Sequence, residues 1–215
     1  MAGNPMPEPV RHTALLIDFG GVLTTSVWES FAEFCARNDL EAETVRNLFR
    51  DDQDARAELR SLETGDLSEG EFELRFAKRL GLAEPAGLID DMFAGMKPYE
   101  PMLGAVAATR AAGVRTGLVS NSWSTSHYNR DMLTKLFDTS VISAEVGLHK
   151  PKPEIYLLAA ERLGSEPREC VFVDDLRENC AGAEAVGMTA ILHRDPAETI
   201  TRLEDLLGIE IAARS

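Results

Sequence analysis

Cysteines, basic residues and long apolar runs are all scarce in this sequence of 215 residues. Its three cysteines, Cys35, Cys170 and Cys180, are an odd number without metal-ligand spacing, so we expect buried reduced thiols rather than disulfides or zinc ligands. No apolar run is long enough to cross a bilayer, and the first residues, MAGNPMPEPVRH, lack the charged-then-apolar order of a signal peptide. We therefore expect a cytoplasmic protein that does not bind membranes.

The shortage of basic residues leaves a strong negative charge. Lysine and arginine number 22 against 36 aspartates and glutamates, which gives a formal net charge of −14. Long-range repulsion disfavours nonspecific binding to nucleic acid or to an anionic membrane, so neither is an expected partner. A site for an anionic ligand must therefore gather positive charge locally. The hydrophobic content of 44% suffices for one good core and a small accessory domain.

Five short apolar runs end at turn or polar residues and predict β-strands, at residues 14–17, 115–119, 139–143, 170–173 and 188–192. Helical periodicity lies between most of them, as in residues 101–112 and in residues 153–163, which have a proline at the start and a glycine after the end. Strands that alternate with helices need crossover connections. We therefore predict an α/β fold with a doubly wound parallel sheet between layers of helices.

The stretch from residue 24 to residue 97 offers no convincing strand. It carries amphipathic, charge-rich helical patterns, for example over residues 27–37 and 69–80. Pro98 and Pro101 then make a stiff return, because proline fixes its own φ and moves its predecessor away from helix. We predict an all-helical domain of residues 24–97, inserted after the first strand of a core domain of residues 1–23 and 98–215.

The candidate functional residues lie directly after the apolar runs. Asp18 follows the first run, Ser120 and Asn121 the second, and Asp174 and Asp175 the fourth. In open α/β sheets, ligands bind beyond the carboxyl ends of the strands, so these side chains are expected to meet at one edge. Three carboxylates there would repel one another unless a hard cation lay among them.

Magnesium is the expected cofactor, since it binds a few carboxylates, keeps several waters and accepts a substrate phosphate, and clustered histidines and cysteines for zinc are absent. Lys150, Ser120 and Asn121 can hold the remaining phosphate oxygens. A carboxylate beside the metal and phosphate can attack phosphorus and form an aspartyl-phosphate, which water later cleaves.

The motifs DFGGVLT, VSNS, GLHKPKPEIY and FVDDLRENCAGAEAVGM, in that order, resemble the four motifs of the haloacid-dehalogenase-like hydrolase superfamily. The resemblance covers most of the chain outside the insertion, whose place is that of a helical cap of the first type. Within the superfamily, the chain is most similar to the N-terminal phosphatase domain of soluble epoxide hydrolases. The resemblance implies a Rossmann-like core with the first strand central, and a cap that closes over the site.

The resemblance also implies the role of each site residue. Asp18 is implied as the nucleophile and a magnesium ligand, and Asp175 as a second ligand supported by Asp174. Ser120 and the Asn121 backbone are implied to bind the transferring phosphoryl group, and Lys150 to neutralise charge. Gly21 and Trp123 are further candidate substrate contacts, although Trp123 can equally pack under the cap.

Gly20 departs from the phosphatase pattern, which has an aspartate there that serves as general acid and then as general base. A glycine still supplies the backbone carbonyl that the family uses as a metal ligand, so Gly20 stays in the expected metal site. Loss of general acid–base help slows a reaction by roughly 100-fold to 10,000-fold. We therefore expect a magnesium-dependent phosphohydrolase for a small phosphorylated metabolite, slowed for poor leaving groups.

Two alternatives stay open: a hydrolytic 2-haloacid dehalogenase, which needs no metal, and a weakly active binding or regulatory domain. Asp174 and Asp175 argue against the first, because such a pair is costly without a cation. His127 and His149 lie near the motifs and have a suitable unperturbed pKa for proton transfer, but a structural or solvent-exposed role is favoured for each. A contact between cap helices could support a homodimer.

Overall fold

The structure, a computed structural model, describes residues 11–124 and 128–211. Five parallel strands form one sheet in the order β3-β2-β1-β4-β5. They are β1 (Ala14–Ile17), β2 (Arg115–Ser120), β3 (Thr139–Ile142), β4 (Cys170–Asp174) and β5 (Thr189–Leu192). The predicted doubly wound parallel sheet, with its first strand in the centre, is confirmed.

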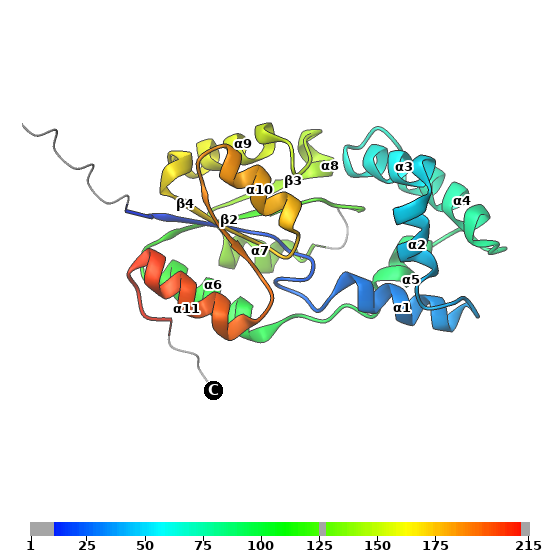
Figure 1. Ribbon diagram of the computed structural model, residues 1–215, viewed down its shortest axis with the longest axis horizontal. Helices are drawn as coiled ribbons and strands as arrows, with labels where there is room; N and C mark the ends of the chain where they lie inside the picture. The colour runs from blue at the N-terminus through cyan, green and yellow to red at the C-terminus, as the bar shows by residue number, and fades with distance from the viewer. Residues whose placement is uncertain (1–10, 125–127, 212–215) are drawn as a thin grey trace, which may run out of the picture.

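Helices cover both faces of the sheet because the strand side chains are buried on both sides (Figure 1). On one face, α6 (Glu100–Ala111), α7 (Arg130–Leu136) and α11 (Pro196–Leu207) pack against residues such as Leu15 and Ile17. On the other face, α9 (Pro153–Leu163) and α10 (Arg177–Ala185) pack against Leu16 and Phe172. The short α8 (Ser143–Val146) and a 3-10 turn, η1 (Pro167–Glu169), complete the core.

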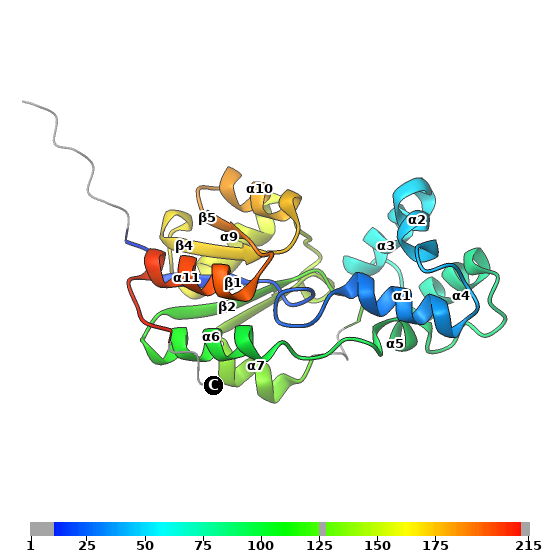
Figure 2. The ribbon, with the colours of Figure 1, turned by 60° about the horizontal axis from the view of Figure 1, so that its bottom comes forward.

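A group of five helices lies at one end of the molecule, beyond the carboxyl ends of the strands (Figures 1 and 2). They are α1 (Val27–Arg37), α2 (Thr44–Asp51), α3 (Gln53–Glu63), α4 (Glu69–Leu80) and α5 (Leu88–Phe93). They bury their own apolar cluster, which includes Phe31, Phe34, Phe72 and Phe76. We call this group the helical insertion. Its helices arise from local signals, such as the capping box of Ser68 and Glu71 and the left-handed Gly81 at the two ends of α4.

The two connections between the core and the helical insertion run side by side. Thr25 N donates to the Lys97 carbonyl at 2.9 Å, and Tyr99 N donates to the Leu23 carbonyl at 2.8 Å. An isolated antiparallel bridge pairs Thr24 with Pro98 between them. The chain therefore leaves the core and returns to it at one point. Within the described residues, no helix is long and apolar enough to span a membrane.

The structure corrects several predicted boundaries by one residue. Ser143 was placed in the third strand, but it opens α8, while Ser120 and Asp174 are the last residues of their strands rather than the first residues beyond them. The fifth strand begins at Thr189, and α6 begins and ends one residue before the predicted helix. Each difference lies at the end of a helix or strand, where one hydrogen bond more or less decides whether a residue is assigned to that element.

Candidate active site

The carboxyl ends of β1 and β4 bring the first two acidic side chains together. β1 and β4 are neighbours on either side of the point where the strand order reverses, which is where open α/β sheets bind ligands. Asp18 follows β1, and its N–H donates to the Val173 carbonyl of β4 at 2.9 Å. Asp174 ends β4 and Asp175 follows it. One oxygen from each of the three carboxylates lies within 4.8 Å of the other two.

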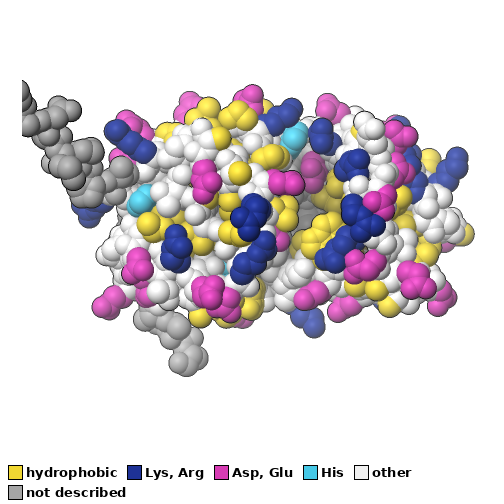
Figure 3. Space-filling view, viewed as in Figure 1, with side chains coloured by type: hydrophobic (Ala, Val, Ile, Leu, Met, Phe, Trp, Pro, Cys, Tyr) yellow, Lys and Arg dark blue, Asp and Glu magenta, His cyan; other side chains and the backbone are white. Residues whose placement is uncertain are grey.

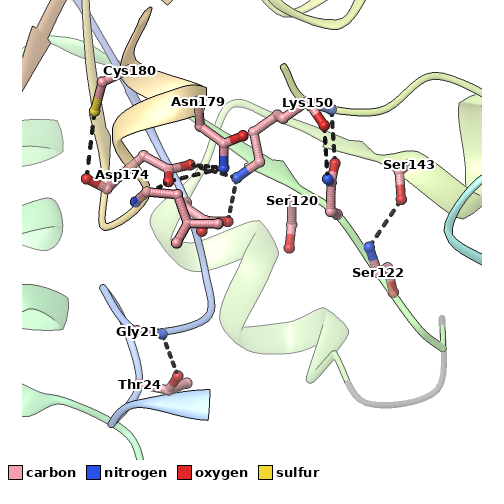
Figure 4. Close-up of polar contacts among 12 residues, drawn as sticks. Gly21, Thr24, Ser120, Ser122, Ser143, Lys150, Asp174, Asn179 and Cys180 are labelled. Atoms are coloured by element: carbon pink, nitrogen blue, oxygen red, sulfur yellow. Dashed lines mark hydrogen bonds and ion pairs between the residues drawn. The ribbon is translucent and has the colours of Figure 1, made fainter. Parts of the chain in front are cut away.

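Lys150 lies between two of these carboxylates. Its Nζ is 2.6 Å from Asp18 Oδ1 and 2.7 Å from Asp174 Oδ2, and its side chain is 1% exposed (Figure 4). Burial works to lower the pKa of Lys150, but the two carboxylates outweigh it and raise the pKa, so the amine is a fixed positive charge. Three carboxylates and one ammonium leave two negative charges in the cluster.

The two outer carboxylates are not fully stabilised by the protein. Burial raises the pKa of Asp18 to about 7 although Lys150 opposes it, and the charge of Asp174 adds to the rise. Burial and Asp174 likewise raise the pKa of Asp175 to about 6. The cluster therefore has two surplus negative charges and carboxylates with raised pKa values. A divalent cation would compensate both charges and lower these pKa values. The oxygen-only donor set suits magnesium, so the residues fit the metal.

Asp174 differs from its neighbours because its oxygens are already occupied. Oδ1 accepts hydrogen bonds from the Leu176 N–H at 2.8 Å and from Asn179 Nδ2 at 3.0 Å, and Oδ2 contacts Asn179 Nδ2 and Lys150. Asp174 is fully buried. These contacts fit the supporting role expected of Asp174. Asn179 was missed in the sequence, although its place five residues after Asp174, in the first turn of α10, puts it within reach.

The glycines after Asp18 make room for this cluster. Gly21 has a φ of +76°, and a Cβ built there would lie 2.7 Å from Asp175 Oδ2. A side chain at Gly21 would therefore displace Asp175. Gly20 lines a cavity beside the site, and a Cβ there would lie 3.0 Å from Val27 Cγ2. The backbone-ligand role of Gly20 and the substrate contact of Gly21 remain predictions.

Ser120 ends β2 and Asn121 follows it, on the other side of Asp18. Ser120 is 3% exposed, and its Oγ accepts a hydrogen bond from the Tyr128 hydroxyl at 2.8 Å. The Asn121 side chain holds the Lys150 backbone from both sides: Nδ2 donates to its carbonyl at 3.1 Å, and Oδ1 accepts from its N–H at 2.9 Å. Asn121 thus positions Lys150. The sequence did not reveal this role of Asn121. Neither residue caps α7, where Asn129 does so.

A cavity of about 470 Å³ opens between the core and the helical insertion, beside Gly20, Ser120 and Asn121. Its walls are mainly apolar, with Phe19, Val27, Phe93, Met96, Tyr128 and Met132 among the lining residues. Its charged lining residues are Lys97 and Asp90. Figure 3 shows a hollow in the surface between the core and the helical insertion, with Lys and Arg side chains on both sides of it.

Trp123 lines this cavity and also joins the helical insertion. Its ring lies 5.3 to 5.6 Å, centroid to centroid, from four phenylalanines of the insertion: Phe31, Phe49, Phe72 and Phe93. The structure therefore supports both sequence interpretations, packing under the insertion and a place at the pocket. The indole N–H is engaged as well, since it hydrogen-bonds the side chain of Glu63.

Glu63, the last residue of α3, was missed in the sequence. Burial raises the pKa of its carboxyl to about 7, while Lys150, the Trp123 hydrogen bond and Arg60 oppose the rise. The charge of Lys150 therefore reaches the Glu63 carboxyl, although Glu63 is not among the residues that line the cavity. Nothing local could have revealed it, because a glutamate at a helix end is ordinarily solvated.

The remaining candidates divide into clear cases. The three cysteines are free and buried, as expected. His149 is 7% exposed, with Nδ1 2.9 Å from the Lys150 carbonyl and Nε2 without a hydrogen-bond partner among the described residues. His127 lies outside the described residues.

Comparisons with known proteins show which family and which fold the chain shares. A family model described as haloacid dehalogenase-like hydrolase matches residues 12–187. The rat bifunctional epoxide hydrolase 2 is 37% identical over 117 residues, which are 51% of this chain and 21% of that protein. The glyceraldehyde 3-phosphate phosphatase of Methanopyrus kandleri is 33% identical over 106 residues, or 47% of this chain and 46% of that protein.

The chain spans about a fifth of the length of the first of these relatives. Among solved structures, a HAD family enzyme of Bacteroides thetaiotaomicron, in complex with magnesium and inorganic phosphate, is 22% identical with a TM-score of 0.64. The match covers 85% of this chain and 94% of that enzyme, and it shows a shared fold.

Proposed function

The chain belongs to the haloacid dehalogenase-like hydrolase family, and we propose that within it the protein is a magnesium-dependent phosphatase of a small phosphorylated metabolite. One observation carries this proposal: the buried Lys150 bridges Asp18 and Asp174, and Asp175 completes a cluster with two surplus negative charges. A dehalogenase that uses no metal would leave that surplus uncompensated.

Asp18 and Asp175 would hold the magnesium ion, with the Gly20 carbonyl as a third protein ligand. When bound, the ion supplies positive charge that neutralises phosphate oxygens and keeps Asp18 ionised. This is consistent with the raised pKa of Asp18, about 7, because a cation would lower it into the range where the carboxylate is a nucleophile at neutral pH.

Each residue of the site then has its own role in the reaction. Asp18 attacks phosphorus, the ester bond to the leaving group breaks, and an aspartyl-phosphate forms. Ser120 and the Asn121 backbone hold the phosphoryl oxygens, and Lys150 neutralises charge on both Asp18 and the phosphoryl group. Water cleaves the aspartyl-phosphate in the second half of the reaction. The leaving group would occupy the cavity beside Gly20, where its mainly apolar wall excludes water.

The experiment is a screen of phosphate monoesters with magnesium, over sugar phosphates, nucleotides, lipid phosphates and acyl phosphates, with Asp18→Asn as the blank. We expect turnover that a chelator abolishes and that Asp18→Asn lowers by at least about 1,000-fold. Beryllium fluoride with magnesium should form a stable acyl-phosphate mimic on Asp18.

Three results would contradict the proposal. Equal activity in Asp18→Asn would remove the nucleophile from its role. Chloride release from 2-haloacids with full activity in chelator would identify a dehalogenase, and absence of both turnover and adduct would identify a binding or regulatory domain.

A further inference from the structure

Tyr128 brings a buried hydroxyl to the end of β2, where Ser120 lies. Its O–H donates to Ser120 Oγ at 2.8 Å, and the two residues are 8% and 3% exposed. Both line the cavity between the core and the helical insertion, together with Gly20. The hydrogen bond between the two hydroxyls therefore belongs to the candidate active site, on the side that faces the cavity.

The position of Tyr128 is fixed at its ring and at its backbone. The ring packs against Phe19, with 5.1 Å between the centroids, and Phe19 directly follows Asp18 in the chain. The residue after Tyr128, Asn129, caps α7 by accepting a hydrogen bond from the Met132 N–H at 3.1 Å. A phenol held in this way keeps its hydroxyl in one place, and a buried tyrosine hydroxyl needs a partner. Ser120 is that partner.

The hydrogen bond decides what Ser120 can still do. A serine hydroxyl has one hydrogen to donate and two lone pairs to accept with. The Tyr128 O–H occupies one lone pair, so the hydrogen of Ser120 stays available for another acceptor. In the proposed reaction, that acceptor is a phosphoryl oxygen.

Tyr128 is suited to donate a hydrogen bond and not to exchange a proton. Burial raises the pKa of Tyr128, so the phenol keeps its hydrogen at neutral pH. General acid–base catalysis favours a group whose pKa lies near the working pH, and the rise moves Tyr128 away from it. A role for Tyr128 therefore has to come from the direction of its hydrogen bond.

We propose that Tyr128 is a positioning residue of this protein, whose hydroxyl turns the Ser120 O–H toward the phosphoryl group of the substrate. The inference rests on the proposed phosphatase activity. A donor that is already aimed needs no reorganisation when charge moves over the phosphoryl oxygens, so it stabilises the transition state. The two hydroxyls also form a chain in which each hydrogen bond polarises the next, which strengthens the donor that Ser120 presents.

Tyr128→Phe tests the proposal, because it removes the hydroxyl and keeps the ring against Phe19. With magnesium and p-nitrophenyl phosphate, we expect kcat/KM to fall about 10-fold to 100-fold in Tyr128→Phe and roughly 100-fold to 1,000-fold in Ser120→Ala, which loses the donor itself. Inorganic phosphate probes the same site without turnover. Its affinity, measured by calorimetry with magnesium, should fall about 3-fold to 10-fold in Tyr128→Phe.

The double variant shows whether Tyr128 acts through Ser120. When Tyr128→Phe is added to Ser120→Ala, kcat/KM should fall by less than about twofold further, because no hydroxyl remains to be turned. A further loss as large as that of Tyr128→Phe alone would mean that Tyr128 acts on the substrate or on the cavity directly, and would overturn the inference. Full activity in Ser120→Ala would overturn it too.

The matched control is Tyr99→Phe. Tyr99 is a partly buried tyrosine of the core and is not among the residues that line the cavity. Its loss of a hydroxyl should change kcat/KM by less than about twofold. All assays are run at a temperature at which the melting curve of every variant shows folded protein, so that a loss of stability is not mistaken for a loss of positioning.

The two levels of the proposal fail in different ways. If the wild type shows neither turnover nor a beryllium fluoride adduct, the phosphatase proposal is wrong and the role of Tyr128 falls with it. If the wild type turns over and forms the adduct while Tyr128→Phe keeps full kcat/KM, or loses the same factor with and without the Ser120 hydroxyl, only the role of Tyr128 is wrong.

Discussion

Two adjacent aspartates of the candidate site have very different surroundings. Asp174 is fully buried, with both oxygens engaged by Lys150, Asn179 and the Leu176 N–H. Asp175 is partly buried, and burial and repulsion from Asp174 raise its pKa to about 6. The Asp174 carboxylate therefore stabilises the fold through its hydrogen bonds and ion pair, whereas the Asp175 carboxylate is available to bind a ligand. Replacing each in turn separates these contributions.

We predict that Asp174→Ala lowers the free energy of unfolding by about 3 to 5 kcal/mol, because it leaves the Lys150 ammonium with a single buried partner. Asp175→Ala should change it by less than about 1 kcal/mol without magnesium, since the loss of the charge also removes repulsion. Urea denaturation in chelator measures both. A larger loss from Asp175→Ala than from Asp174→Ala would contradict this assignment.

Glu63 gives a prediction for the pH dependence of stability. Its pKa is raised from 4.5 to about 7 on folding, so the folded state holds its proton between these values while the unfolded state releases it. The stability it contributes is therefore complete below about pH 4.5 and is lost as pH rises through about 7. Glu63→Gln, which carries no charge, should be more stable than the wild type at pH 8 by on the order of 1 to 3 kcal/mol, and no more stable at pH 4.5. Urea denaturation at the two pH values checks this, and a difference independent of pH would contradict it.

Among the structural elements, the helical insertion has a core of its own, and Trp123 ties it to the sheet. Phe72 is fully buried in α4, its ring 5.1 Å from Phe76 and 5.6 Å from Trp123. The same helix exposes Leu74, which is 62% exposed. The position of α3, and with it Glu63, depends on this packing because α3 and α4 contact each other.

We predict that Phe72→Ala destabilises the protein by about 3 to 5 kcal/mol and shifts Trp123 fluorescence, because it opens a cavity beside the indole. Leu74→Ala, on the same helix, should change stability by less than about 0.5 kcal/mol. Phosphatase activity should fall with Phe72→Ala and stay unchanged with Leu74→Ala. Equal effects of the two substitutions, measured by urea denaturation, would show that the cluster does not stabilise the insertion.

The turn after β1 offers a second contrast. Gly21→Ala places a Cβ against Asp175 and forces a left-handed φ of +76° on an alanine, a strain of about 1 to 2 kcal/mol. Gly104→Ala, in open space on α6, should instead stabilise the protein by roughly 0.5 to 1 kcal/mol. We expect Gly21→Ala to weaken magnesium binding, read from titrations followed by melting temperature, and Gly104→Ala to leave it unaltered. Magnesium binding of wild-type strength in Gly21→Ala would show that Asp175 is not displaced.

The sequence predicted the elements better than their contacts. Apolar runs located all five strands to within one residue, and α1, α4 and α9 begin and end where their periodicity and caps place them. Asp18, Asp174 and Asp175 met as expected, because residues at the ends of parallel strands share an edge. Lys150 joins them from the loop between α8 and α9. Asn121 and Glu63 were not foreseen in their roles, since the partners of each are set by tertiary packing between segments distant in the chain.

For the whole molecule, magnesium should behave as a stabilising ligand. A cation that binds the folded cluster stabilises it by about 2.7 kcal/mol at one hundred times its dissociation constant, which is about 5 to 10 °C in Tm for a chain of this size. We predict such a rise on adding magnesium, its reversal by a chelator and its absence in Asp175→Ala. A Tm that ignores magnesium would contradict the proposed metal site.

The paired connections at Thr25 and Lys97 carry a consequence for how such a protein can change over time. The two ends of the helical insertion are hydrogen-bonded to each other where they join the core. Another domain whose ends lie equally close together could therefore replace the segment between them without moving the two attachment points of the core. Asp18, Lys150, Asp174 and Asp175 all lie outside the exchanged segment. Val27, Phe93 and Met96 of the cavity wall lie within it, so inheritance of a new insertion would replace that part of the wall in one event. In this protein, the part of the cavity that the insertion forms would evolve as one unit, separately from the proposed nucleophile.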